Sequence, residues 1–331
     1  MNRWHDWTSY FFLTTNLIKE VRAMIKRMLS GLICVGVIVA GSIYCDAAVH
    51  KKGGTSAGNF LKLGVGARAI GMGEAFTAVA TDANAIYWNP AGLANLDRRQ
   101  INAMHNTWLV DTYYDHLSFA TPFKNGAMCA GLTYLGGEDI DKYIIENNSP
   151  KPDGSFNAYD LALIGGYGWK LSDELLVGVS GKLIQSKIDN YNANGIAVDL
   201  GVLSQTPVEN LTVGGTIQNI GSKIKFNKDG DSLPLMIKAG AAYTMLDNNL
   251  TTALDITKAR DNDVKFNIGG EYLVAKSFAV RAGYSSKIDE GAGITAGIGY
   301  KHPVVTVDYA YVPWGDLEKD THRVSLLFNL Y

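Results

Sequence analysis

The sequence predicts an all-β protein: a transmembrane, antiparallel, up-and-down β-barrel of about fourteen strands, with a small, partly helical N-terminal hatch in the lumen. Three observations lead to this prediction. From about residue 99 to residue 331, apolar and polar residues alternate with the period of two that is typical of strands. The strand-like runs are even in number, and short connections alternate with long ones. An export signal precedes them all.

The alternation is clear in single runs, such as the one between Val264 and Tyr272, where Val, Phe, Ile, Gly and Tyr alternate with Lys, Asn, Gly and Glu. A soluble sheet alternates too, but its solvated face is usually dense in charge. Here the polar positions are mostly Gly, Ala, Ser, Thr and Asn, with sparse charges that suit pairing across a barrel lumen. Those charges are Asp160, Lys182, Asp199, Lys238, Asp255, Glu271, Arg281 and Asp308.

The connections are the second observation, and they predict a strict long–short alternation, as between the two rims of a membrane barrel. The predicted strands are centred near residues 104, 117, 131, 163, 180, 199, 214, 239, 253, 268, 280, 296, 307 and 326. The short connections include Phe123–Gly126, Leu171–Glu174, Leu246–Asn249, Val274–Ser277 and Lys301–Pro303. The long ones include Gly136–Phe156, Asn219–Pro234 and Val312–His322.

The N-terminus has the order of a secretory signal peptide. Lys26 and Arg27 precede the apolar run Met28–Tyr44, and small residues follow it up to Ala47. We expect cleavage after Ala47, with Ala48 as the second choice; a retained transmembrane anchor is the alternative. The chain then divides into an N-terminal extension with the signal peptide (1–47), a hatch (48–98) and a barrel (99–331), exported to the cell outer membrane.

No motif in the sequence predicts catalysis, a cofactor or a metal site. Gly54–Gly58 spells the nucleophile elbow G-x-S-x-G, but no buried strand leads into it. Gly64–Ala69 spells a dinucleotide fingerprint, again without its strand. The six histidines have no ligand spacing, and a net charge of −2 does not predict a nucleic-acid partner. We therefore expect a protein that is not an enzyme.

The run Phe60–Leu96 differs from the strands, being rich in Ala and Gly, with a helix-compatible middle at Gly73–Thr81. Its elements Gly66–Ala69, Gly71–Gly73 and Trp88–Leu93 (WNPAGL) resemble the PorV/PorQ-like proteins of the FadL-type superfamily of long-chain fatty-acid and aromatic-hydrocarbon transporters. The resemblance covers the whole mature chain and implies a hatch followed by a fourteen-stranded barrel. It implies that Asn89, Pro90, Ala91 and Gly92 form the gating motif of the hatch.

Two functions follow from the resemblance. The first is a channel or carrier that binds a small hydrophobic compound between hatch and wall and releases it through a lateral opening in the wall. The alternative is an outer-membrane subunit of a type IX-like secretion system, a barrel that holds exported cargo and contacts secretion-machinery proteins. In both cases the lipid bilayer of the outer membrane surrounds the barrel.

Elementary chemistry adds expectations for the hatch itself. Pro90 fixes its own φ and disfavours helix at Asn89, so these two residues should end the preceding helical stretch. The Asn89 amide can then bond the backbone groups left free. The hatch charges Arg68, Glu74 and Asp82 are expected to pair with charges of the lumen.

Overall fold

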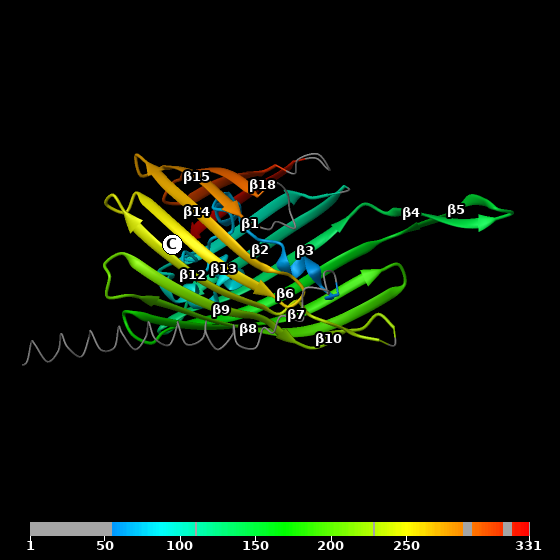
Figure 1. The fold of residues 1–331 in the computed structure, drawn as a ribbon, viewed down its shortest axis with the longest axis horizontal. Helices are drawn as coiled ribbons and strands as arrows, with labels where there is room; N and C mark the ends of the chain where they lie inside the picture. The colour runs from blue at the N-terminus through cyan, green and yellow to red at the C-terminus, as the bar shows by residue number, and fades with distance from the viewer. Residues whose placement is uncertain (1–54, 110, 228, 287–292, 314–319, 331) are drawn as a thin grey trace, which may run out of the picture.

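A computed structural model describes residues 55–109, 111–227, 229–286, 293–313 and 320–330. It confirms a closed, antiparallel barrel of fourteen strands, in which β1 pairs with β18 to close the wall (Figure 1). Each predicted strand centre lies within one of these strands. The barrel strands are β1 (Arg99–Thr107), β2 (Thr112–Pro122), β3 (Gly126–Gly137), β6 (Ala158–Lys170), β7 (Leu175–Ile188), β8 (Tyr191–Gln205), β9 (Leu211–Gly221), β12 (Met236–Met245), β13 (Leu250–Ala259), β14 (Val264–Val274), β15 (Phe278–Ser285), β16 (Ile294–Lys301), β17 (Val305–Val312) and β18 (Thr321–Leu330).

The predicted strict alternation of connection lengths is wrong. The rim that carries the start of β1 and the end of β18 has short turns, as expected. The opposite rim carries long connections after β3 and β9, but the turns at 108–111, 189–190 and 260–263 are short. Asp189 has a φ of +54°, the left-handed conformation that lets two residues reverse an antiparallel pair. We call this opposite rim the long rim.

Two small hairpins occupy the long connections. β4 (Ile140–Glu146) and β5 (Ser149–Phe156) form an arm that projects beyond the barrel (Figure 1). β10 (Lys223–Ile224) and β11 (Asp231–Ser232) form the second hairpin, which folds over the mouth of the barrel: Ile224 and Leu233 are buried. The sequence reading treated both segments as loops.

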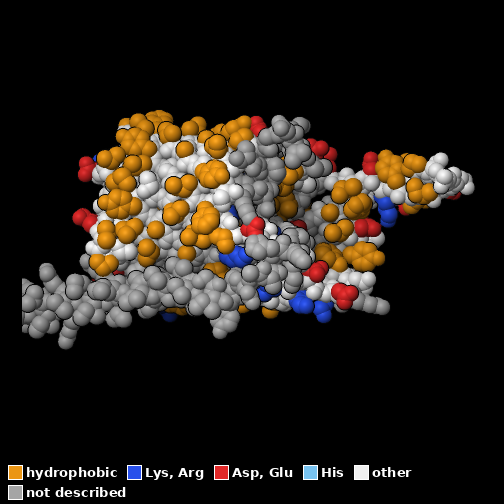
Figure 2. Space-filling view, in the orientation of Figure 1, with side chains coloured by type: hydrophobic (Ala, Val, Ile, Leu, Met, Phe, Trp, Pro, Cys, Tyr) orange, Lys and Arg blue, Asp and Glu red, His pale blue; other side chains and the backbone are white. Residues whose placement is uncertain are grey.

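The two faces of the wall differ as predicted. Apolar side chains cover its outside (Figure 2), and Phe266 and Leu200 are 50% and 47% exposed. The intervening polar residues, such as Asn267 and Asp199, are buried inside. Neighbouring side chains of a strand point to opposite sides of the wall, so residues of one strand alternate between the outside and the lumen. The outside therefore has the character of a lipid-facing surface.

The wall shows no gap in its ladder. β3 pairs in continuous register with β2 on one side and with β6 on the other. Among the described barrel strands, the one register shift lies between β8 and β9, next to Asp199. The Asp199 carboxylate accepts a hydrogen bond from the backbone N–H of Asn219 across this shift, at 2.8 Å. Among the described residues, each wall strand pairs with both of its neighbours, so strand pairing alone does not reveal the lateral opening expected from the resemblance.

The N-terminal segment lies inside the barrel as a compact hatch. It contains η2 (Asn59–Lys62), α2 (Ala67–Gly71), α3 (Ala85–Trp88) and η3 (Pro90–Asn95). The helix expected at 73–81 is wrong: this stretch forms turns between α2 and α3. Gly73 and Glu74 both adopt positive φ, of +63° and +65°, and two left-handed residues in succession interrupt a right-handed helix.

None of the described helices is long and apolar enough to span a membrane. The predicted signal peptide and its cleavage position lie outside the described residues. The described hatch begins at Thr55, and the first barrel strand begins at Arg99.

Candidate functional site

The hatch fills the lumen through side chains that are almost fully buried. The α3 residues Tyr87 and Trp88 lie with their rings edge to face, at 5.2 Å between centroids. Trp88 Nε1 donates to the carbonyl of Val65 at 2.8 Å, and the Tyr87 hydroxyl donates to the carbonyl of Leu63 at 2.7 Å. Both aromatic residues therefore bind the earlier hatch segment to α3 and leave no buried polar atom of their own unpaired.

Asn89 and Pro90 end α3 at Trp88, where Asn89 becomes extended with a φ of −157°. The Asn89 side chain bonds in three directions. Its amide donates to the carbonyl of Thr77 in the hatch at 2.9 Å and to that of Val202 in β8 at 3.1 Å. Its Oδ1 accepts from the backbone N–H of Ala91 at 3.2 Å. Asn89 is thus a buried link between two hatch segments and the wall.

Backbone touches backbone where the hatch meets the wall. A Cβ added at Gly73 would lie 2.5 Å from the backbone nitrogen of Tyr284 in β15. A Cβ added at Gly178 in β7 would lie 2.2 Å from the carbonyl carbon of Pro90. Glycine is required at both places because any side chain would push the hatch off the wall.

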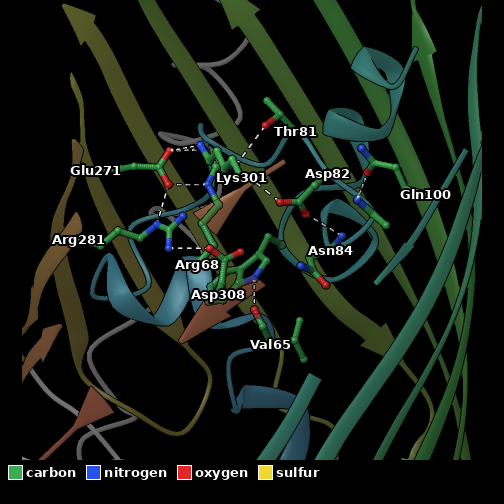
Figure 3. A network of polar contacts seen from close by, with 12 residues as sticks. Val65, Arg68, Thr81, Asp82, Asn84, Gln100, Glu271, Arg281, Lys301 and Asp308 are labelled. Carbon is green, nitrogen blue, oxygen red and sulfur yellow. Dashed lines mark hydrogen bonds and ion pairs between the residues drawn. The ribbon is translucent and has the colours of Figure 1, made fainter. Parts of the chain in front are cut away.

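An ionic network connects the hatch to β14–β17 (Figure 3). Arg68 in α2 donates two hydrogen bonds of 2.9 Å to Glu271 in β14. This is the bidentate geometry that a guanidinium makes with a carboxylate. Glu271 also pairs with Arg281 at 2.6 Å, and Arg281 pairs with Asp308 at 2.8 Å. Burial alone would lower the pKa of Arg68, but Glu271 raises it above its ordinary value, so the hatch side of the network stays charged.

The other two hatch charges have different partners. Glu74 pairs with Lys265 of β14. Burial alone would raise the pKa of the Glu74 carboxyl, but Lys265 lowers it below its ordinary value. Asp82 does not pair with a lumen charge as predicted: it lies 3.6 Å from Arg68 and accepts from the backbone N–H of Asn84 at 2.9 Å. Its role is therefore within the hatch.

A wall carboxylate also holds the turns of the hatch. Asp255 Oδ2 in β13 accepts from the backbone N–H groups of Phe76 and Thr77, at 3.0 and 2.8 Å. These donors belong to the stretch in which a helix was expected. The lumen charge takes the place of helical partners and holds the turn against the wall.

A cavity of about 150 Å³ lies between the hatch and β12–β14, towards the long rim. Trp88 and Glu74 form its hatch side, while Met236, Thr257 and Lys265 belong to the wall. This volume has room for several waters or for one small organic molecule. Its lining residues are Lys62, Glu74, Trp88, Met236, Lys238, Thr257, Ala259, Asn262, Asp263, Lys265 and Asn267.

Lys238 differs from the other cations of this cavity. Lys62 pairs with Asp261 at 3.1 Å and Lys265 pairs with Glu74. The Lys238 ammonium lies 4.7 Å from the ring centroid of Trp88 and 5.7 Å from that of Tyr87, and none of the described carboxylates lies within ion-pair distance of it. Lys238 is only 7% exposed, so aromatic faces stabilise a buried positive charge that lines the cavity.

A second cavity, of about 280 Å³, lies on the opposite side of the hatch. It is lined by Arg68, Asp82 and Thr81 of the hatch and by residues near the short-turn rim, among them Lys301 and Asn329. The hatch therefore stands between one cavity near each rim. Within the described residues, no group of His, Cys, Asp and Glu side chains is arranged to hold a metal ion.

The sequence identified Asn89–Gly92 and the three hatch charges, and the structure brings Arg68 and Asp82 together while placing Glu74 with Lys265. The cavity was missed. Lys238 was recognised as a lumen charge, but its neighbours Lys62 and Trp88 lie far from it in the sequence. No local spacing signals such a site, because the closure of the barrel brings its residues together.

Comparisons with known proteins agree with this architecture. The profile of a family described as "Uncharacterised protein family (UPF0164)" matches residues 34–133. A search of curated proteins found no match. The toluene transporter TbuX of Ralstonia pickettii is similar in structure, with 14% sequence identity and a TM-score of 0.60 over 81% of this chain and 99% of that chain. The toluene transporter TodX of P. putida is similar with 14% identity and a TM-score of 0.61, over 81% of this chain and 99% of that chain. These likenesses show the fold: a barrel of the type found in these transporters.

Proposed function

We propose that this protein is an outer-membrane channel or carrier for small, largely hydrophobic compounds. The observation that supports this most is the cavity that the hatch and the wall line together. A solute bound there touches both a fixed wall and a plug held by side-chain contacts, so movement of the plug would change its access. The apolar outside of the barrel supports an outer-membrane location, and the similarity to two toluene transporters supports transport.

The lining of the cavity indicates the chemistry of the compound. Trp88 and Met236 offer apolar contact, while the buried ammonium of Lys238 lies over the rings of Trp88 and Tyr87 and forms no ion pair with a described carboxylate. A compound with a small apolar body and one negatively charged end would satisfy both. A purely hydrocarbon solute would leave the charge of Lys238 without an anionic partner.

Binding measurements on the detergent-purified barrel test this proposal, with benzoate and toluene as probes. We expect benzoate to bind and Lys238→Met to weaken its binding by about ten- to a hundredfold, because a hydrogen bond to a charged group contributes about 1.5–3 kcal/mol. Toluene binding should change little. Lys170→Met serves as a matched control, since Lys170 forms an exposed pair with Asp173 and neither residue lines the cavity. Absence of binding of both probes would contradict the proposal.

A second candidate function is that of a PorV/PorQ-type subunit, which holds exported proteins for a secretion system. One observation favours it: the arm β4–β5 projects beyond the barrel and carries exposed apolar side chains. Vesicles that contain the purified barrel distinguish the two functions. Solute uptake into such vesicles, with no other protein present, supports transport; its absence, with a correctly folded barrel, favours the secretion role.

A further inference from the structure

The two outer strand edges of the arm differ in whether they can pair with another strand. β4 pairs with β5 and with no other described strand, so both outer edges of this hairpin are open. An isolated two-stranded hairpin is marginally stable in water. Open edges also invite pairing with other chains, and proteins usually block them with proline, charge or a bulge. In this arm, one edge is blocked and the other is not.

The turn of the arm determines which backbone groups face outward. Asn147 and Asn148 have φ values of +51° and +60°, as in a two-residue type I′ turn. In that turn the flanking pair, Glu146 and Ser149, is hydrogen-bonded. Pairs then alternate along the ladder, so the next outward-facing residues are Ile145 and Tyr143 on β4, opposite Pro150 and Pro152 on β5.

On β5, both outward N–H positions are therefore occupied by proline, which has no donor. A register shift follows between Asp141 and Tyr143, and Gly154 on the β5 side has a φ of +86°. Proline and the irregularity both block pairing at this edge. The β4 edge has neither: Tyr143 and Ile145 keep their outward N–H and carbonyl groups, and their side chains are 58% and 73% exposed.

The side chains around the free edge indicate what would pair with it. Ile140 and Ile144 are exposed, and strand alternation places them on the face opposite to Tyr143 and Ile145, so both faces of β4 carry apolar side chains. Near the base, Asp141 has no ion pair among the described residues, and Glu138 has none either. The one cation of β4, Lys142, is paired with Asp189 at 3.4 Å. The free edge is thus apolar along its length and acidic at its base.

We propose that the β4 edge is a docking site for an extended segment of another polypeptide, which adds to it as a third strand. Main-chain hydrogen bonds to Tyr143 and Ile145 supply the binding, and alternating apolar side chains of the segment cover the exposed Ile and Tyr residues. A basic residue at the end near the barrel complements Glu138 and Asp141. This inference does not depend on the transport proposal, since the arm lies outside the lumen.

The test uses the purified full barrel in detergent and a labelled synthetic peptide, acetyl-Lys-Val-Thr-Val-Lys-Val-Thr-Val-amide, with fluorescence anisotropy as the measurement of binding. The same peptide with its second valine replaced by proline serves as the matched probe. We expect the first peptide to bind and the proline peptide to bind at least tenfold more weakly. Backbone amide exchange should slow at Tyr143 and Ile145 when the first peptide is bound.

Variants of both arm strands distinguish strand pairing at the β4 edge from nonspecific hydrophobic binding. Ile145→Pro removes an outward donor and should weaken peptide binding at least tenfold, whereas Ile145→Ala keeps the donor and should weaken it much less. Pro150→Val with Pro152→Val restores the donors of β5 and should create a second binding site per barrel. Equal binding by Ile145→Pro and Ile145→Ala would overturn the proposal. So would undiminished binding after deletion of residues 139–156, or dimerisation of the barrel through the arm in place of peptide binding.

Discussion

Single residues decide how firmly the hatch is held. Arg68 is the hatch residue that contacts the ionic network of β14–β17 directly, and its guanidinium binds Glu271 through two hydrogen bonds. Its removal leaves Glu271 neutralised by Arg281 and Lys301, so the wall keeps its own balance of charge. The hatch alone loses a contact.

Arg68→Met should therefore loosen the hatch without unfolding the barrel. We expect a loss of about 1.5–3 kcal/mol in hatch binding, visible as more frequent openings in planar-bilayer recordings. Arg98→Met is the control: Arg98 forms an exposed pair with Asp97, and exposed pairs contribute about 0–1 kcal/mol. Identical recordings for both variants would show that the network does not hold the hatch.

Glu74 predicts a pH dependence. Its pKa is lowered in the folded protein, so its pairing with Lys265 stabilises the seated hatch above the ordinary value of 4.5 and is lost as pH falls through the lowered value. Leak through the barrel should thus rise only in acid below pH 4.5. Glu74→Gln should leak more at neutral pH and lose that acid-induced rise. A wild-type leak that begins between pH 6 and 7 would contradict this assignment.

At the scale of elements, the packing of hatch on wall depends on glycine. Gly73→Ala combines a left-handed φ with a Cβ placed 2.5 Å from the backbone of Tyr284, so we expect the turn after α2 to move off β15 and the leak to rise. Gly165→Ala is the control, because a Cβ there meets no atom within 4 Å. The Gly73 variant should also melt at a lower temperature than the Gly165 variant, and equal melting would contradict the close packing.

The predictability of each element followed from the range of the interactions that form it. The strands were predictable because alternation is local, and each run such as Val264–Tyr272 carries its own signal. The turns at 73–81 were not, because Asp255, far along the chain, binds the N–H groups of Phe76 and Thr77. The arm had a local signal that was missed: Asn tolerates the left-handed conformation, and the Asn147-Asn148 pair suits a two-residue hairpin turn.

The same distinction applies to the candidate site. Asn89-Pro90 ends a helix for reasons contained in two residues, and its position at the end of α3 follows from the sequence alone. Arg68 and Glu271 meet only because the barrel closes, and the sequence suggests such a pair without identifying the partner. The cavity around Lys238 lay beyond prediction for the same reason.

At the scale of the whole molecule, the apolar outside of the barrel should face lipid. Phe266→Arg should impair membrane insertion, because a cation on the lipid face costs up to about 2–4 kcal/mol, the value at the bilayer midplane. Thr257→Arg is the matched control: it belongs to the adjacent strand, lines the cavity and should be milder. Gly201, next to lipid-facing Leu200, is unsuitable as a control, since a Cβ there would lie 2.2 Å from Asn89 Oδ1. Equal membrane insertion of the two Arg variants would contradict the assignment of Phe266 to the lipid-facing side of the wall.

The central claim is that residues 55–98 form a folded plug inside a barrel that is complete without them. All fourteen barrel strands lie outside this segment, and the ladder closes between β1 and β18. The contacts of the hatch with the wall are side-chain bonds and close packing, with no strand of its own in the ladder.

The most direct test is the single-channel conductance of the barrel in planar bilayers, with and without residues 53–95. We predict that the deleted protein still assembles as a heat-resistant barrel and conducts ions freely, while the intact protein conducts little. The double variant Asn89→Leu with Pro90→Ala should show a smaller increase. An assembled barrel whose conductance is unchanged by the deletion, or a deletion that prevents assembly, would contradict the account.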